Sequence, residues 1–176
     1  MIVVADSSPL NYLIQIQHDS LLQELYTRVF VPTAVIEELR HPRAPVAIAS
    51  WLQHIPAWLE VRSATSKVGS LEDLDAGERE AIFLAEEMRA SLLLIDEKQG
   101  RLAAKRRSIS TIGTLGVLLA GGKKGLADPE LLFQRLIAET TFRGFASDQG
   151  TLPFLLQRIG QVTRPSLAIE IERPLT

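Results

Sequence analysis

The pattern of hydrophobic and polar positions predicts short buried strands that alternate with amphipathic helices. Residues 2–5 form an apolar run of strand length, and the runs VFVP at 29–32 and SLLLID at 91–96 have the same character. Helical spacing of apolar residues and turn signals predict helices over 9–17, 34–40, 46–55, 76–89, 97–107 and 113–122, and an amphipathic stretch over 19–28. Such alternation is typical of an α/β domain with a mainly parallel sheet.

The pattern changes after Gly125. Asp128 and Pro129 begin an amphipathic helix over 130–139, a shorter helix is predicted over 152–160, and LAIEIE in the tail alternates like an edge strand. We therefore expect one domain over 1–160, with its core in 1–125 and C-terminal helices in 126–160. A C-terminal tail over 161–176 follows it.

Composition narrows the class of protein. The chain has 176 residues, of which 46% are hydrophobic, so one domain can bury a full core. No apolar run approaches the roughly 20 residues of a membrane span, and the start lacks a signal-peptide pattern, so we expect a soluble, cytoplasmic protein. The absence of cysteine excludes thiolate ligands, which leaves oxygen or histidine ligands for any metal. A net charge of −2 argues against nucleic-acid binding by overall positive charge, but not against a local basic surface.

Two aspartates follow predicted strands. Asp6 comes directly after the run at 2–5, and Asp96 ends the run at 91–96. Parallel strands end at the same edge of a sheet, where ligands bind, so we expect both carboxylates at that edge. They lie within reach of one metal only if their strands are neighbours. Each aspartate can equally cap the helix that follows it.

Helical geometry, at about 100° per residue, places Glu38 at the border of the buried face of its helix and Glu78 within the buried face of its own. Glu38 lies about 110° from the centre of its apolar stripe and Glu37 about 150°, while Glu78 lies about 30° from the centre of its own stripe and Glu80 points away. The alternative for Glu38 is a residue at the rim of the buried face. The alternative for Glu78 is a carboxylate that interacts favourably with the dipole of its own helix. Four crowded carboxylates repel by about 4 kcal/mol per close pair at an effective dielectric of 20. A divalent cation, Mg²⁺ or Mn²⁺, would relieve that repulsion.

These residues stand in motifs that resemble those of PIN-domain nucleases, the fold of VapC-type toxins. The likeness is greatest to an uncharacterised VapC-like branch, and the matching segments are VVADSSPL, VPTAVIEELR, LDAGEREAIFLA, LLLIDEKQGR and IGTLGVLLA. It is strong over residues 1–125 and looser to about 160. The resemblance implies a three-layer α/β/α fold with a mainly parallel central sheet.

The same resemblance implies a metal-dependent ribonuclease with Asp6, Glu38, Glu78 and Asp96 as catalytic, metal-binding acids. One or two Mg²⁺ or Mn²⁺ ions would lower the pKa of a bound water and neutralise charge on an RNA phosphate, leaving a 5′-phosphate. Two departures point to one metal and weak activity. Leu94 stands where many PIN proteins have threonine, and Glu97 and Gln99 stand where another acid is common. Ser7 either holds a metal-bound water or caps the helix.

A basic helix supplies cations for an RNA substrate. Lys98, Arg101 and Lys105 recur at helical spacing, and further cations follow at Arg106, Arg107, Lys123 and Lys124. The alternative is an ordinary solvated helix face whose charge favours the helix C-terminus. If the helix binds RNA, neutralising Arg101 and Lys105 weakens a salt-sensitive interaction. Thr114 near a strand end is a further substrate-binding candidate, although a cap explains it as well.

Partners follow from the resemblance. It implies a toxin paired with a small antitoxin protein, and a homodimer. The main alternative is a PIN-like module that is weak or inactive as an enzyme and acts through protein interaction, with the apolar helices after Ala127 as its interface. An aspartate-nucleophile phosphotransferase is a lesser alternative, because Ser8 stands where those enzymes usually carry a second acid.

Overall fold

The computed structural model describes residues 1–65 and 69–142, which form an α/β structure around a central sheet. Within these residues the sheet has five strands, all parallel, in the order β3-β2-β1-β4-β5. The strands are β1 (Ile2–Ala5), β2 (Arg28–Pro32), β3 (Leu59–Arg62), β4 (Leu92–Leu94) and β5 (Thr111–Ile112). The first strand of the chain therefore lies at the centre of the sheet.

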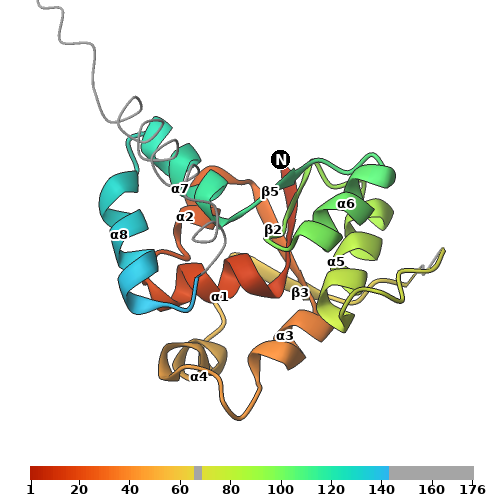
Figure 1. Ribbon diagram of the computed structural model, residues 1–176, viewed down its shortest axis with the longest axis horizontal. Coiled ribbons are helices and arrows are strands. Elements are labelled where there is room, and N and C mark those ends of the chain that lie inside the picture. The colour runs from red at the N-terminus through yellow and green to blue at the C-terminus, as the bar shows by residue number, and fades with distance from the viewer. Residues whose placement is uncertain (66–68, 143–176) are drawn as a thin grey trace, which may run out of the picture.

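Helices cover both faces of the sheet, which gives three layers (Figure 1). The helices are α1 (Ser7–Gln15), α2 (Leu21–Leu25), α3 (Thr33–Leu39), α4 (Val46–Gln53), α5 (Ala76–Glu87), α6 (Lys98–Arg106), α7 (Thr114–Lys123) and α8 (Pro129–Glu139). Helices α5 and α6 lie on one face, α1, α2 and α7 on the other, and α8 packs against α7. Helix α3 follows β2 and contacts both α1 and α5 at the carboxyl ends of the strands.

The strands place alternate residues in two separate cores, as the two-residue period of a strand requires. Val3 and Ala5 pack with α1, α2 and α7, whereas Val4 packs with α5 and α6 on the opposite face. Phe30, Leu93 and Ile95 join Val4 in that second core. Both faces of the sheet are therefore buried at the inner strands β1, β2 and β4, which explains why these three strands read as apolar runs in the sequence.

The structure confirms the predicted α/β class, its parallel sheet and its three layers, and differs from the sequence prediction mainly at element ends. The first helix begins at Ser7, not at Pro9. Proline is compatible with the first turn because the first N–H groups of a helix have no partner within it. Between α6 and α7, Thr111 and Ile112 form the two-residue edge strand β5. The predicted helix 152–160 and the tail 161–176 lie outside the described residues.

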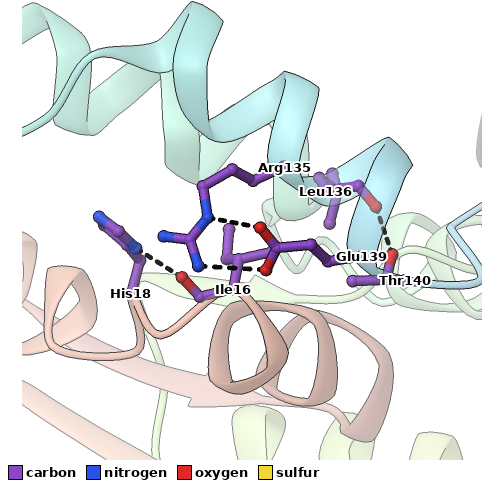
Figure 2. Close-up of polar contacts among 6 residues, drawn as sticks. All are labelled: Ile16, His18, Arg135, Leu136, Glu139 and Thr140. Carbon is purple, nitrogen blue, oxygen red and sulfur yellow. Dashed lines mark hydrogen bonds and ion pairs between the residues drawn. The ribbon is translucent and has the colours of Figure 1, made fainter.

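The end of α8 lies beside the turn that follows α1 (Figure 2). Arg135 and Glu139, one turn apart on α8, form an ion pair at 2.8 Å, and the Nδ1–H of His18 donates to the carbonyl of Ile16 at 2.7 Å. The hydrogen bond to Arg135 lowers the pKa of the Glu139 carboxyl, with a smaller contribution from His18. Partly exposed pairs of this kind contribute little to stability, so burial of the apolar face of α8 holds the helix in place.

In residues 1–65 and 69–142, no helix has the length and hydrophobicity that a bilayer crossing needs.

Candidate functional site

Asp6 lies at the carboxyl end of the central strand, and its side chain is completely buried. Its backbone N–H donates to the carbonyl of Leu94 at 2.9 Å, which fixes the residue against the neighbouring strand β4. Its side chain is 0% exposed, and neither carboxylate oxygen has a hydrogen-bond partner among the described residues. A buried polar group without a partner is costly, so its presence in a native fold calls for an explanation.

Burial raises the pKa of the Asp6 carboxyl from 3.8 to about 8. The nearby negative charges of Asp75, Glu78 and Glu38 raise this pKa further, in that order. The backbone amide of Ser7 opposes the shift, although it does not reach hydrogen-bonding geometry with either carboxylate oxygen. The metal-free protein at neutral pH therefore holds Asp6 largely protonated.

Glu38 reaches the site from α3. The residue is half-buried while Glu37 is exposed, in agreement with the helical geometry. Its Oε1 accepts a hydrogen bond from the backbone N–H of Gly77 at 2.7 Å, at the start of α5. Burial raises the pKa of the Glu38 carboxyl, the Gly77 amide and the Ser7 hydroxyl lower it, and the charge of Asp75 raises it. Ser7 thus contacts a site carboxylate and is not only part of a helix start.

Glu78 is buried in the first turn of α5, with a residue exposure of 6%. Its Oε2 accepts from the backbone N–H of Asp75 at 3.4 Å, and its Oε1 is buried without a partner among the described residues. Burial raises the pKa of this carboxyl, and the charges of Asp75, Glu97 and Glu38 raise it further. Glu78 is therefore a first-turn residue of α5 whose carboxyl is also subject to the charges of the neighbouring acids.

Asp75 is the acid of this cluster that we did not predict from sequence. It is exposed, and its Oδ1 accepts from the backbone N–H of Glu78 at 2.7 Å, which completes a capping box at the start of α5. Its charge acts on Asp6, Glu38 and Glu78 alike. The signal that could have found it is the spacing D-x-x-E before an apolar helical pattern.

Glu80 also differs from expectation, because it does not simply face solvent. It is half-buried and accepts hydrogen bonds from the backbone N–H of Ala34 at 2.7 Å and of Ala64 at 3.2 Å. Ala34 lies in the first turn of α3, so α5 supplies a carboxylate to the start of α3 while α3 supplies Glu38 to the start of α5. This reciprocal pairing fixes the two helices relative to one another.

Asp96 follows β4, the strand beside β1, so Asp6 and Asp96 do end neighbouring strands. Its carboxylate accepts from the backbone N–H of Thr114 at 2.8 Å and from the Thr114 hydroxyl at 2.5 Å. Burial raises the pKa of Asp96, whereas Thr114 and the positive charge of Arg101 lower it. Thr114 is completely buried, so it can act on a substrate only through Asp96.

The structure brings Asp6, Glu38 and Glu78 together with Asp75, and holds Asp96 separately at the start of α7. Within residues 1–65 and 69–142, no three acidic or histidine side chains lie in position to hold a metal ion. Glu38, Glu78 and Asp96 each accept a hydrogen bond from a backbone N–H group. The unpartnered oxygens of Asp6 and Glu78 nevertheless fit a divalent cation, which prefers oxygen ligands and would satisfy buried carboxylates.

An open pocket of about 450 Å³ runs along α6, and we call it the basic groove. Its lining comprises Lys98, Arg101, Leu102, Lys105, Ser108, Ile109, Ser110 and Thr111. The predicted substrate-binding cations of α6 therefore share one concave surface, and Arg101 also acts on Asp96. Arg107 instead pairs with Glu86 at 2.5 Å, and Lys124 donates to the carbonyl of Leu25 at 3.5 Å.

A second, smaller pocket of about 210 Å³ borders Glu38. Asn11, His41 and Arg43 contribute polar groups to its lining. The Nδ1 of His41 accepts from the backbone N–H of Arg43 at 3.1 Å, so its Nε2 is left to carry the ring's proton in the neutral form. Potential hydrogen-bond donors thus lie beside Glu38 as well as beside Asp96.

Comparisons with known proteins give a family match and one similar solved structure. A family model described as DUF3368, PIN domain, matches residues 2–161. The solved structure is a PilT N-terminus domain protein from the hyperthermophilic archaeon Sulfolobus solfataricus P2, 17% identical, with a TM-score of 0.49 over 81% of this chain and 99% of that one. A search of curated proteins gives no match.

Proposed function

The chain belongs to the PIN-domain family, whose members are generally nucleases, and from that premise we propose that it is a divalent-metal-dependent endoribonuclease. The substrate is RNA, the reaction is hydrolysis of a phosphodiester bond, and the cation is Mg²⁺ or Mn²⁺. The family match covers residues 2–161, which include every acid and cation assigned to the site.

The observation that carries this proposal is the buried, unpartnered carboxylate of Asp6. A carboxylate whose only role was to cap α1 would accept a hydrogen bond from that helix, and Asp6 accepts none among the described residues. Asp75, Glu38 and Glu78 add negative charge around it. A site of this charge and burial is stable in its ionised form only with a cation, because the carboxylates otherwise repel one another.

Asp6 and Glu78 would hold the cation through their unpartnered oxygens, and Glu38 and Asp96 are the other two acids that we assign to the site. When bound, a divalent cation supplies positive charge to the scissile phosphate and lowers the pKa of water. The chain's own groups do the rest. Lys98 and Lys105 attract the RNA backbone into the basic groove, and Arg101 orients a phosphate next to Asp96.

We further propose a VapC-like toxin role, with a homodimer and a small antitoxin protein as partners. Leu131 and Ile137 on α8 are 54% and 46% exposed, which leaves apolar side chains for a protein contact. The alternative, a PIN-like module that acts only through protein interaction, uses the same helix but does not require cleavage. Sedimentation of the purified chain measures the dimer, and cleavage separates the two functions.

The test is calorimetric titration of Mn²⁺ and Mg²⁺ into the wild type and into Asp6→Asn and Asp96→Asn, with a structured-RNA cleavage assay alongside. Glu37→Gln serves as the control, since Glu37 adjoins Glu38 in sequence but is exposed. We expect metal binding and cleavage in the wild type and the control, and loss of both in Asp6→Asn. A wild type that folds but binds neither ion would contradict the metal-dependent nuclease and favour the interaction module.

A further inference from the structure

Three glycines in the segments around the site lie where a larger side chain would collide with a site carboxylate. The first is Gly77, in the first turn of α5. A Cβ atom built there would lie 2.4 Å from Oε2 and 2.8 Å from Cδ of Glu38. Carbon atoms that are not bonded make contact at about 3.5–4.0 Å, so the carboxylate of Glu38 occupies the space that alanine would need.

The other two glycines repeat this arrangement with different acids. A Cβ atom at Gly100, in α6, would lie 2.7 Å from Oε1 of Glu78, the oxygen that has no hydrogen-bond partner among the described residues, and 2.3 Å from Ile95 Cδ1. A Cβ atom at Gly113, which precedes α7, would lie 2.5 Å from Oδ1 of Asp96. Each of Glu38, Glu78 and Asp96 therefore lies against a glycine from another segment of the chain.

Local backbone preference does not explain these glycines. None of the three has a φ in the left-handed region. At the helical positions 77 and 100, alanine would ordinarily favour the helix by about 1 kcal/mol over glycine. At position 77 the group in the way is a carboxylate alone, whereas at position 100 the side chain of Ile95 lies in the way together with the carboxylate of Glu78.

We infer that Gly77, Gly100 and Gly113 are positioning residues that set where the carboxylates of Glu38, Glu78 and Asp96 lie. The inference rests on the proposed metal-dependent function, because it assigns these glycines a role toward the cation. A carboxylate is the free end of a flexible side chain, so an added methyl group displaces the carboxylate more readily than the backbone. At positions 77 and 113 the predicted effect of alanine is therefore on metal binding more than on folding, whereas at position 100 the collision with buried Ile95 adds a loss of stability.

The chain offers a matched control in Gly116, on α7. A Cβ atom there would lie 2.2 Å from Cγ1 and 2.7 Å from Cδ1 of Ile112, a collision of similar severity in which no carboxylate takes part. Gly116→Ala therefore measures the cost of crowding a side chain near the site without moving an acid.

The experiment compares Gly77→Ala, Gly100→Ala and Gly113→Ala with Gly116→Ala. The readouts are Mn²⁺ affinity by calorimetry, thermal unfolding in the absence of metal, and RNA cleavage. We expect the first three variants to bind Mn²⁺ about 10- to 100-fold more weakly than the wild type, the range seen when groups that orient metal ligands are changed. Gly116→Ala should bind Mn²⁺ as the wild type does, whatever its melting temperature.

A second variant distinguishes displacement of the Glu38 carboxylate from a general loss of structure. Glu38→Asp shortens the acid by one methylene group and frees the space beside position 77. Gly77→Ala should therefore weaken Mn²⁺ binding in the Glu38 background and have little further effect in the Glu38→Asp background.

Equal losses in both backgrounds, or wild-type affinity in all three glycine variants, would overturn the inference while leaving the proposed function intact. Absence of Mn²⁺ binding in the wild type would instead overturn the proposed function and, with it, this role of the glycines.

Discussion

The acidic cluster around Asp6 and the basic groove along α6 adjoin one another but are assembled differently. The acids come from separate parts of the chain, and the fold brings them together through the order of β1, β2 and β4 and the pairing of α3 with α5. The groove is local, because its lining residues lie between positions 98 and 111. Changes to the fold should therefore damage the acidic cluster first and leave the groove's charge intact.

The two regions also differ in their exposure to water. Asp6 is completely buried and its pKa is raised to about 8, whereas Lys98 and Lys105 are exposed. Charges in a buried cluster act strongly on one another and are little screened by salt, while exposed charges lose most of their effect beyond about 8 Å at physiological ionic strength. The cluster should therefore respond to pH and metal, and the groove to salt.

The largest expected effect comes from Asp6→Asn. The substitution keeps the size of the side chain but removes the charge that would bind the cation, so cleavage should fall by more than about 100-fold and Mn²⁺ affinity with it. RNA binding through the groove should be retained, because Lys98 and Lys105 are untouched. Single-turnover cleavage and filter binding measure the two effects, and equal loss of both would show that the regions are not independent.

The pH dependence of stability should also separate the two regions. Asp6 has a pKa of 3.8 unfolded and about 8 folded, so between these values the folded protein holds a proton that the unfolded chain has lost. The free energy of unfolding should therefore fall as pH rises from about 4 to about 8.

Denaturant unfolding in EDTA at pH 5, 6, 7 and 8 measures this slope. Asp6→Asn should flatten it and should make the metal-free protein more stable than the wild type at pH 7. Identical slopes in the two proteins would contradict the burial of an ionisable Asp6.

A smaller effect is expected at the contact that orients α3 against α5. Glu80→Ala leaves the backbone N–H groups of Ala34 and Ala64 without their acceptor, at a cost of about 1–3 kcal/mol of unfolding free energy. Glu37→Ala, on the exposed face of α3, is the control and should change stability by less than about 0.5 kcal/mol. Metal affinity should fall only in Glu80→Ala, because only that change loosens the helix that carries Glu38.

The smallest effect should come from the groove. Lys98→Ala with Lys105→Ala removes two groove cations without touching Arg101, which acts on Asp96. The slope of log affinity against log salt for single-stranded RNA should decrease by about 1.4. Arg106→Ala is the control, since Arg106 is exposed but does not line the groove. An unchanged slope would favour an ordinary solvated helix face.

Features that depend on one segment were predictable from the sequence. Strand β1 begins and ends where the apolar run does, and helical angle alone distinguished half-buried Glu38 from exposed Glu37. Asp6 could be placed at the edge of the sheet because it follows an apolar run. Each of these inferences uses a period that the backbone imposes on its own side chains.

Features that depend on two segments were not predictable. The helical periodicity of α5 predicts that Glu80 lies away from the apolar stripe. The first turn of α3 lies beside Glu80, however, and the backbone N–H of Ala34 donates to its carboxylate. Asp75 is exposed, and its sequence position does not indicate that its charge acts on three buried or half-buried acids. The strand order that makes Asp6 and Asp96 neighbours is also a property of the assembled sheet. All of these features depend on tertiary contacts, which a single sequence does not show directly.

The reciprocal pairing of α3 and α5 gives the molecule an internal reference for amide hydrogen exchange. The amide of Ala34 is protected by Glu80 and the amide of Gly77 by Glu38. Separation of the two helices would expose both amides to exchange, but a cation that draws Glu38 away would accelerate exchange at Gly77 alone. The ratio of the two exchange rates therefore reports the movement of one carboxylate, independently of the overall stability of the protein.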